Sequence, residues 1–347
     1  MAPVTNRRLL FNAYTNGLPQ PGKATRYDGS QTIDPDTVPL NGGFLIKTLV
    51  LSIDPFIVEK MRPKTPGAQL PAYTIGEPIE DYGVGVVLRS ENPTIKAGDH
   101  VYGVQGGAYP FAEYVIANDV TQYRVLEKKD KLHWSVYVGT LGMPGQTAYC
   151  GWKEFSKAKK GDVVFVSGGA GPVGSLVIQL AKMDGCKVIA SAGSDEKVAF
   201  MKKIGADVPF NYKTENTADI LKKEGGIDIY WDNVGGATLE AALDSAKLGA
   251  KFIECGMISA LTSYPQGATR NLFTIIPKQI TMNGFVVSFL VPKYEEEFYR
   301  VMSELIASGK IQYGEEVIPS LELGGEALLA VLTGTNKAKV VIEVAKE

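Results

Sequence analysis

The chain has 347 residues, 45% of them hydrophobic and 21% charged, and its formal net charge at pH 7 is -2. This length predicts two domains, the near-neutral charge excludes an extensive basic surface for nucleic acid, and no apolar run reaches the roughly 20 residues that span a membrane. The N-terminal residues lack the apolar core of a signal peptide, and the three cysteines lack disulfide or metal spacing, so we expect a cytoplasmic protein.

The first 130 residues predict a β-rich domain. Three segments, 44–51, 83–88 and 112–116, are rich in β-branched and other apolar residues. Prolines and glycines punctuate the stretches between them, which is typical of short strands joined by turns.

A glycine-rich turn opens the second part of the chain. The stretch VSGGAGPVGS, 167–176, lies between an apolar strand pattern at 162–166 and a helical pattern at 175–182, and a second strand pattern follows at 187–190. Glycines allow the backbone to approach a ligand closely, and the N–H groups at a helix start attract a pyrophosphate. Because these elements come in the order of a βαβ unit, the stretch predicts dinucleotide binding rather than a plain surface turn.

Strand and helix patterns alternate from this turn to residue 309, which predicts an α/β fold with a doubly wound parallel sheet. An amphipathic helix is predicted at 294–306, and the tail ends in a predicted strand at 339–344. The strands of the parallel sheet are predicted at 162–167, 187–192, 208–212, 227–232, 251–255 and 281–287.

The end of the second of these strands bears on the choice of dinucleotide. An NAD site commonly has an acidic residue there, but this strand ends in Ala190-Ser-Ala-Gly193. Ser194 suits the N-cap of a helix, with Asp195 and Glu196 in its first turn. Lys197 together with Ser194 would receive a 2′-phosphate, whereas a contact of Asp195 with an unphosphorylated ribose is the competing interpretation. We favour NADP(H).

The histidines give no sign of a metal site. His100 and His133 are the two histidines, and neither belongs to a C-x-x-C or H-E-x-x-H pattern. Both are expected to be surface or structural residues rather than ligands, and we expect no metal.

Six motifs occur in order along the chain. They are Gly139-Thr-Leu-Gly-Met-Pro-Gly-Gln-Thr-Ala-Tyr149, Gly193-Ser-Asp-Glu-Lys197, Asn211-Tyr-Lys213, Asp232-Asn-Val-Gly-Gly236, Cys255-Gly-Met-Ile-Ser259 and Gly284-Phe-Val-Val287. Together they resemble the zinc-independent medium-chain dehydrogenase/reductases, in the branch of NADPH-dependent double-bond reductases and prostaglandin/leukotriene reductases, and the resemblance covers nearly the whole chain. It implies a GroES-like substrate domain, 1–130 and 310–347, a Rossmann NADP(H)-binding domain, 131–309, and a homodimer whose Rossmann sheets join edge to edge.

The resemblance also implies which residues contact the cofactor. It places the glycine turn at the pyrophosphate, the segment after the second strand at the adenosine ribose and its 2′-phosphate, and the motif that ends at 287 at the nicotinamide. The implied cofactor-binding residues are Ala170, Gly171, Val173, Gly174, Gly193, Ser194, Lys197, Tyr212, Asn233, Cys255, Phe285, Val286, Val287 and, from the tail, Asn336.

The substrate side departs from the family pattern. Phe56 stands where plant members carry Tyr after Asp-Pro, and Leu261 stands where they carry a Tyr that assists at the substrate carbonyl or donates a proton. Tyr82 matches a pocket position, and Tyr264 lies three residues after Leu261. We expect Phe56, Tyr82 and Leu261 to line the substrate site, and Tyr82 or Tyr264 to act as the acid.

The implied reaction is NADPH-dependent reduction of the carbon–carbon double bond of an α,β-unsaturated aldehyde or ketone. Hydride addition at the β-carbon leaves an enolate, whose oxygen needs hydrogen-bond donors. Two alternatives remain open. One is a quinone reductase or a zinc-free alcohol/ketone oxidoreductase on the same scaffold, and the other is a non-enzymatic NADPH-binding protein.

Overall fold

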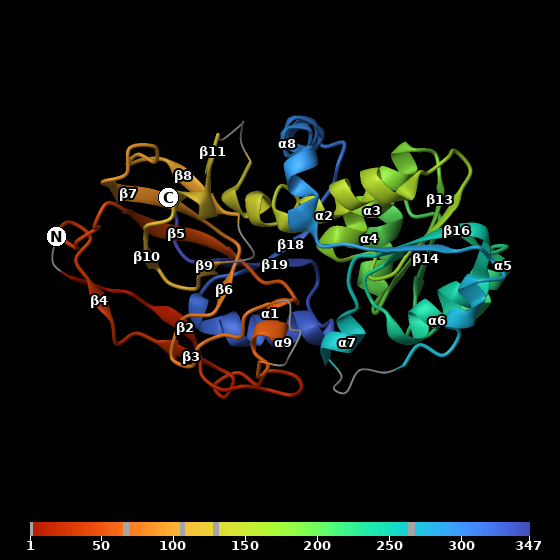
Figure 1. Cartoon of the computed structure of the whole chain (residues 1–347), viewed down its shortest axis with the longest axis horizontal. Coiled ribbons are helices and arrows are strands. Elements are labelled where there is room, and N and C mark those ends of the chain that lie inside the picture. The colour runs from red at the N-terminus through yellow and green to blue at the C-terminus, as the bar shows by residue number, and fades with distance from the viewer. Residues whose placement is uncertain (1–2, 65–69, 105–107, 128–131, 263–267) are drawn as a thin grey trace. The chain divides into compact units, whose positions relative to one another are not determined.

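The computed structural model describes residues 3–64, 70–104, 108–127, 132–262 and 268–347. The chain divides into two compact units, and each is described by itself (Figure 1). The β-rich unit combines Met1–Gly142 with Glu315–Glu347, and the parallel-sheet unit is Met143–Gly314. These boundaries fall later along the chain than the predicted 130/131 and 309/310.

The β-rich unit is built on a seven-stranded sheet with the order β11-β8-β7-β5-β19-β18, in which β10 also pairs with β5. Its central strand, β5, is buried along nearly its whole length, as its run of apolar residues predicts. The C-terminal tail completes the sheet, because β19 pairs antiparallel with β5. The strands are β5 Phe44–Ser52, β7 Gly83–Ser90, β8 His100–Gly103, β10 Tyr114–Ala117, β11 Tyr123–Leu126, β18 Glu315–Ile318 and β19 Lys339–Glu343.

Smaller elements surround this sheet. Short strands form three two-stranded pairs, β1 with β4, β2 with β3 and β6 with β9. The tail also contains the helix α9, which the sequence patterns did not reveal. These elements are β1 Val4–Thr5, β2 Arg8–Phe11, β3 Thr25–Asp28, β4 Thr32–Ile33, β6 Glu80–Asp81, β9 Tyr109–Pro110, α1 Ile57–Lys60 and α9 Gly324–Thr333.

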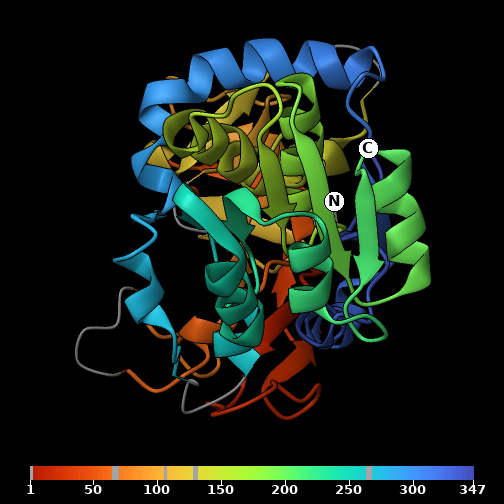
Figure 2. The same cartoon turned by 90° about the vertical axis from the view of Figure 1, so that its right-hand side faces the viewer.

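The parallel-sheet unit contains a six-stranded sheet with the order β14-β13-β12-β15-β16-β17, and every pair in it is parallel (Figure 2). This order confirms the predicted doubly wound α/β fold. Two strand predictions need correction, because β16 begins before residue 251 and β17 ends before residue 287. The strands are β12 Val163–Val166, β13 Lys187–Ala192, β14 Val208–Asn211, β15 Ile227–Asp232, β16 Ala246–Glu254 and β17 Thr281–Gly284.

Helices cover this sheet on both faces. Alternate residues of a strand point to opposite faces, and Phe165 packs with Leu221 of α5 and Leu239 of α6 on one of them. On the other face, Ile178 of α3 and Met201 of α4 close over Gly169. The helices are α2 Met143–Gly151, α3 Pro172–Met183, α4 Asp195–Lys203, α5 Thr217–Lys223, α6 Gly236–Ser245, α7 Ile258–Thr262 and α8 Val291–Ala307, with a π-helix at Trp152–Ser156.

The strand order fixes where a ligand can bind in this unit. The chain winds outward in one direction from β12 through β13 to β14, and in the other from β15 to β17. Ligands of such sheets bind at the carboxyl ends of the strands, where the order reverses. The loops after β12 and β15 therefore carry the candidate cofactor site.

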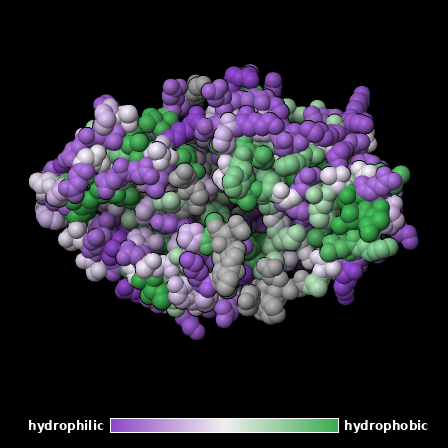
Figure 3. Space-filling model, viewed as in Figure 1, coloured by the Kyte–Doolittle hydropathy of each residue, from purple (hydrophilic) through white to green (hydrophobic). Residues whose placement is uncertain are grey.

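The outer edge of this sheet carries exposed apolar side chains. β17 is the edge strand, and large apolar residues before and after it reach the surface. Figure 3 shows a hydrophobic area in the region where Figure 1 labels β16. The exposed apolar residues of this part are Leu248, Leu272, Phe273, Ile276, Val286 and Phe289. None of the helices in the described part of the chain is long and apolar enough to cross a membrane.

Candidate active site

The glycine turn forms an anion-binding cradle at the start of α3. Gly168 has a φ of +60°, and a Cβ on Gly174 would lie 2.5 Å from the carbonyl oxygen of Gly168, so both positions require glycine. The N-cap residue, Gly171, provides no side-chain acceptor. The first N–H groups of a helix have no partner within it, so those of Val173 and Gly174 are left for a ligand. This geometry fits the pyrophosphate of a dinucleotide.

A second part of the site lies at the carboxyl ends of β13 and β14. A Cβ on Gly193 would lie 2.9 Å from the hydroxyl oxygen of Tyr212 and 3.1 Å from Cε of Lys213. Only glycine allows this tyrosine to approach the end of β13. The Tyr212 side chain is half exposed, so part of it is accessible to a ligand.

The start of α4 carries the residues expected at the 2′-phosphate. Ser194 is the N-cap, and its Oγ accepts a hydrogen bond from the Lys197 N–H at 3.4 Å, which confirms the capping interpretation. Asp195 is exposed, and its Oδ1 accepts a hydrogen bond of 2.8 Å from Nδ2 of Asn211. One carboxyl oxygen of Asp195 is thus hydrogen-bonded within the protein, and Lys197 brings a positive charge to the first turn of α4.

The loops after β12 and β15 are bonded to each other. Asn233 donates from its backbone N–H to Ser167 Oγ at 2.9 Å and from Nδ2 to the Ser167 carbonyl at 2.7 Å. Its Oδ1 accepts a hydrogen bond of 3.2 Å from Nε1 of Trp231. An amide nitrogen has two N–H groups, so Asn233 keeps one for a ligand.

Cys255 follows β16 at the same edge of the sheet. Its N–H donates to the carbonyl of Asp232 at 3.1 Å. Burial, reinforced by the charge of Asp232, raises the pKa of the Cys255 thiol well above its ordinary value. A thiol of raised pKa stays protonated at neutral pH, so Cys255 presents an uncharged side chain at this edge of the sheet.

The segment after β17 is anchored by one aromatic ring. Phe285 packs on Trp231 and Phe155, with ring centroids 5.9 and 5.6 Å apart. A Cβ on Gly151 would lie 2.6 Å from Cζ of Phe285, so this ring requires the glycine beneath it. Val286 is 60% exposed. The ring thus fixes a short stretch of backbone that reaches the surface and includes Val287.

Tyr82 and Phe56 lie together in the β-rich unit. Their ring centroids are 6.3 Å apart, and the Tyr82 ring stacks on Tyr102 at 5.7 Å. The Tyr82 side chain is buried, but no described residue forms a hydrogen bond with its hydroxyl group. Burial, with the charges of Asp81 and Asp54, raises the pKa of Tyr82 above its ordinary value, so the group remains an O–H donor.

The other expected substrate residues are not all described. Leu261 is half-buried in α7 of the parallel-sheet unit, and Tyr264 lies outside the described residues. Asn336 lies in the β-rich unit, in the loop before β19, where its Nδ2 donates to the Ala338 carbonyl at 2.8 Å.

A buried lysine next to the segment that leads into Phe56 escaped the sequence analysis. Lys339 Nζ donates to Ser52 Oγ at 2.6 Å, to the Ile53 carbonyl at 2.9 Å and to Asp54 Oδ1 at 2.8 Å. The lysine and Asp54 are 4% and 3% exposed. The ion pair fixes the segment that leads into Phe56. The only sign of this ion pair in the sequence is a lysine directly before the apolar residues of β19.

Asp81 joins this cluster through backbone groups. Its Oδ2 accepts a hydrogen bond of 2.8 Å from the Asp54 N–H, and its Oδ1 accepts one of 2.9 Å from the Tyr82 N–H. Burial and the neighbouring Asp54 raise the pKa of Asp81 well above its ordinary value, and Lys339 opposes this shift. We name Lys339, Asp54 and Asp81 the buried cluster.

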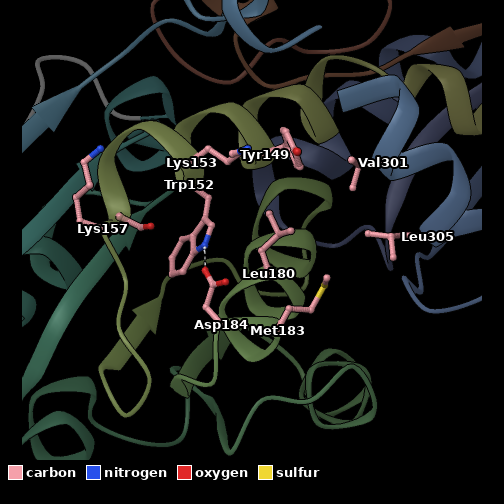
Figure 4. A pocket seen from close by; sticks show the side chains of 10 residues that line it. Tyr149, Trp152, Lys153, Lys157, Leu180, Met183, Asp184, Val301 and Leu305 are labelled. Carbon is pink, nitrogen blue, oxygen red and sulfur yellow. Dashed lines mark hydrogen bonds between the residues drawn. The ribbon is translucent and has the colours of Figure 1, made fainter. Parts of the chain in front are cut away.

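A pocket of about 340 Å³ lies elsewhere in the parallel-sheet unit (Figure 4). Trp152 and Asp184 form part of its wall, joined by a hydrogen bond of 2.8 Å from Nε1 to Oδ2. Asp184 directly follows α3, whereas the glycine turn precedes it, and twelve helical residues span about 18 Å. The pocket therefore lies at the opposite end of α3 from the anion-binding cradle.

Comparisons with known proteins identify the family. Residues 9–122 match a model described as the N-terminal domain of oxidoreductase, and residues 172–308 match one described as zinc-binding dehydrogenase. The chain is 40% identical to (+)-pulegone reductase of Mentha piperita, over 99% of this chain and 100% of that protein. The chain belongs to the medium-chain dehydrogenase/reductase family, in its double-bond reductase branch.

Two further relatives agree with this placement. The chain is 39% identical to the NADP(+)-dependent 2-alkenal reductase of Nicotiana tabacum, over 99% of both proteins. Among solved structures, CurA from Vibrio vulnificus in complex with NADPH matches with a TM-score of 0.86 and 29% identity, over 98% of this chain and 100% of that one.

Proposed function

We infer that the protein is an NADPH-dependent reductase of carbon–carbon double bonds conjugated to a carbonyl group. The observation that carries this inference is the end-to-end similarity to a 2-alkenal reductase, whose named substrate is an aldehyde with a conjugated double bond. The cradle at α3 and the lysine in the first turn of α4 give the chain the groups that such a cofactor requires.

Each part of the cofactor has a proposed binding segment. The turn before α3 holds the pyrophosphate, the ends of β13 and β14 hold the ribose and its 2′-phosphate, and the segment after β17 holds the carboxamide. The proposed contacts are Ala170, Gly171, Val173, Gly174, Gly193, Ser194, Lys197, Tyr212, Asn233, Cys255, Phe285, Val286, Val287 and Asn336. When bound, NADPH supplies the hydride for the β-carbon of the substrate.

The chain's own task is to stabilise the negative charge that develops on the carbonyl oxygen. Tyr82 is the proposed donor, because its hydroxyl has no hydrogen-bond partner among the described residues and keeps its proton. Phe56, which packs against this ring, would form the apolar wall of the substrate site together with Leu261. Tyr264 is the alternative donor.

Replacing Lys197 with alanine is expected to weaken NADPH binding by about tenfold to a hundredfold, since a charge-assisted hydrogen bond contributes roughly 1.5–3 kcal/mol. NADH lacks the 2′-phosphate, so its affinity should barely change. Titration of both cofactors against both proteins measures the effect, with Lys202→Ala at the far end of α4 as a matched control. Equal affinities of the unmodified protein for NADPH and NADH would contradict the assignment.

A panel of substrates separates this function from its alternatives. NADPH oxidation is followed with enals, enones, simple ketones and quinones in parallel. The inference requires enals or enones to be turned over with the highest kcat/KM. A preference for quinones or simple ketones would establish the second oxidoreductase class, and no oxidation with any member would leave a binding protein.

We propose that the enzyme works without zinc in the cytoplasm. Among the described residues, no group of three His, Cys, Asp or Glu side chains is placed to hold a metal ion. Cys150, Cys186 and Cys255 are all free thiols, which suits a reducing compartment. Elemental analysis should find no stoichiometric zinc, and chelators should leave turnover intact. Activity that chelation removes and zinc restores would overturn this proposal, as would recovery in a membrane or secreted fraction.

We also propose a homodimer formed through β17. An edge strand presents unpaired backbone groups, and the exposed apolar residues beside it favour a covered surface. Phe289 is 83% exposed although it is large and apolar. Light scattering should report a dimer, and Phe289→Asp should shift it toward a monomer. A monomeric unmodified protein would contradict the proposal.

A further inference from the structure

Two acidic side chains meet at the carboxyl edge of the parallel sheet. Asp232 is the last residue of β15, Glu254 is the last residue of β16, and the two are paired in the parallel register of these strands. Paired residues on neighbouring strands point to the same face of a sheet. Glu254 was not singled out by any motif, and neither residue belongs to the proposed contacts with the cofactor.

Every hydrogen bond that the Asp232 carboxylate accepts from the described residues is accepted by the same oxygen, Oδ1. The other oxygen, Oδ2, and both carboxyl oxygens of Glu254 are buried and have no donor. The two carboxyl groups act on each other, yet as two carboxylates neither can donate a hydrogen bond to the other. The donors to Asp232 Oδ1 are the Tyr230 hydroxyl at 2.8 Å, Ser167 Oγ at 3.1 Å, and the N–H groups of Val234 at 2.7 Å and Gly235 at 2.8 Å.

A single proton on Glu254 would supply the hydrogen-bond donor that Asp232 Oδ2 lacks. The protonated carboxyl donates its O–H to Asp232 Oδ2, and Asp232 remains the anion that its four donors stabilise. Buried polar groups in folded proteins are nearly always paired, so the protonated state is the one that the fold favours.

In the part of the chain that the structure describes, no cation is placed to take the proton's role. The titratable neighbours on which Glu254 acts are Tyr230 and Cys255, both neutral with raised pKa values. β17, the other neighbouring strand of β16, carries no titratable residue. On the same strand, Lys247 pairs with Asp228 at 2.7 Å, and Lys251 alternates to the opposite face.

The helical elements nearby offer no free charge either. In the π-helix that packs on β16, Lys153 and Glu154 are paired with residues of α8. In α6, which packs on β15, Glu240 is paired with Arg270 at 2.7 Å, and Asp244 accepts a hydrogen bond of 2.8 Å from Asn271.

The pair lies beneath two loops that are bonded to each other. The carbonyl of Asp232 accepts hydrogen bonds from the N–H groups of Cys255 and Gly256, each at 3.1 Å. The carbonyls of Asn233 and Val234 accept from the next loop as well, from Ile258 and Ser259 at 3.2 and 3.1 Å. A change in the spacing of the two carboxyl groups is therefore transmitted to both loops.

We propose that Glu254 is a positioning residue, which holds one proton against Asp232 and thereby fixes the loops 232–236 and 255–259 for cofactor binding. Burial, followed by the charge of Asp232, raises the pKa of Glu254 to about 9. Above that pH the proton leaves to solvent, and two adjacent negative charges push the loops apart and repel the phosphates of the cofactor.

The first test needs no cofactor, so it stands even if the proposed function fails. The folded-state pKa of Glu254 lies above its unfolded value of 4.5, so the folded chain holds an extra proton between these values. Stability from this group therefore falls as pH rises through that window. Glu254→Gln has no proton to lose, and its amide N–H can donate to Asp232 at every pH.

The Tm of this variant, minus that of the unmodified protein, should grow by roughly 3 °C per pH unit between pH 6 and pH 8. A constant difference would overturn the proposal. Should the Gln variant fail to fold, Glu254→Leu serves instead, because it also removes the titration and predicts the same widening difference.

The second test measures NADPH affinity against pH. In the unmodified protein, the Kd for NADPH should rise by about tenfold more between pH 8 and pH 10 than it does in Glu254→Gln. The reason is that tight binding requires protonated Glu254, and the protonated fraction of this residue falls over that range. All other proposed contacts with the cofactor are the same in both proteins, so only the effect of residue 254 remains in the comparison. If Kd changed with pH by the same factor in both proteins, the positioning role of Glu254 would be contradicted. Absence of NADPH binding at pH 7 would instead contradict the proposed function.

Discussion

Tyr82→Phe is expected to lower kcat by about 10²–10⁴-fold, the usual contribution of a positioned proton donor. The substitution keeps the ring, its stacking on Tyr102 and its contact with Phe56, and removes only the hydroxyl. Because no described residue hydrogen-bonds to that hydroxyl, no structural bond is lost with it. The effect should therefore appear in turnover, with NADPH affinity and Tm nearly unchanged.

Steady-state kinetics with an enal, together with NADPH titration, measures this effect. Tyr109→Phe is a suitable control, since it removes a buried hydroxyl of the same unit that is hydrogen-bonded to Thr48 at 3.1 Å. That variant should lose a little stability and no turnover. Unchanged kcat in Tyr82→Phe would remove Tyr82 from the mechanism. A large fall in Tyr264→Phe would then assign the donor there, and two silent variants would leave water or the cofactor ribose as the proton route.

Lys339→Met should cost about 3–5 kcal/mol of unfolding free energy, because it leaves a buried carboxylate without its cation. Asp54 and Asp81 would then face each other as the remaining members of the buried cluster, both almost fully inaccessible to water. Part of the loss should be recovered at lower pH. Without the lysine, the pKa of Asp81 is raised further, so protonation relieves the repulsion as pH falls.

Urea unfolding of three proteins tests this expectation. Lys187→Met removes an exposed lysine that lies 2.5 Å from Glu224, and should cost at most about 1 kcal/mol. The double variant Lys339→Met, Asp54→Asn should be more stable than Lys339→Met alone, because the uncompensated charge is gone. A loss in Lys339→Met no larger than that in Lys187→Met would show that the buried cluster contributes little.

The parallel sheet was predictable because its inner strands, such as β12, are continuous apolar runs, the pattern of strands buried on both faces. The misplaced boundaries have local causes. The first part of β16 contains Gly249 at a φ of +76° and a shift of register opposite Ile227 and Ile229, so its composition does not look like a strand. On the neighbouring edge strand, β17 ends at Gly284, and the apolar residues that follow enter a short 3₁₀ turn at Val287–Phe289.

The parts of the candidate site that residues close together in the sequence form could be predicted. The glycine turn and the Ser194 cap are each formed by residues a few positions apart, and their spacing is visible in the sequence. The buried cluster is different, because Lys339 and Asp54 are 285 positions apart and meet only through the pairing of β19 with β5. Glu254 becomes noticeable only once the register places it beside Asp232.

The central claim is that the conjugated double bond, not the carbonyl group, receives the hydride. The most direct measurement is identification of the product from one 2-alkenal incubated with the enzyme and excess NADPH, by NMR or mass spectrometry. The saturated aldehyde, formed in a one-to-one ratio with the NADPH consumed, is the predicted result. An allylic alcohol, in which the double bond survives and the carbonyl is reduced, would contradict it.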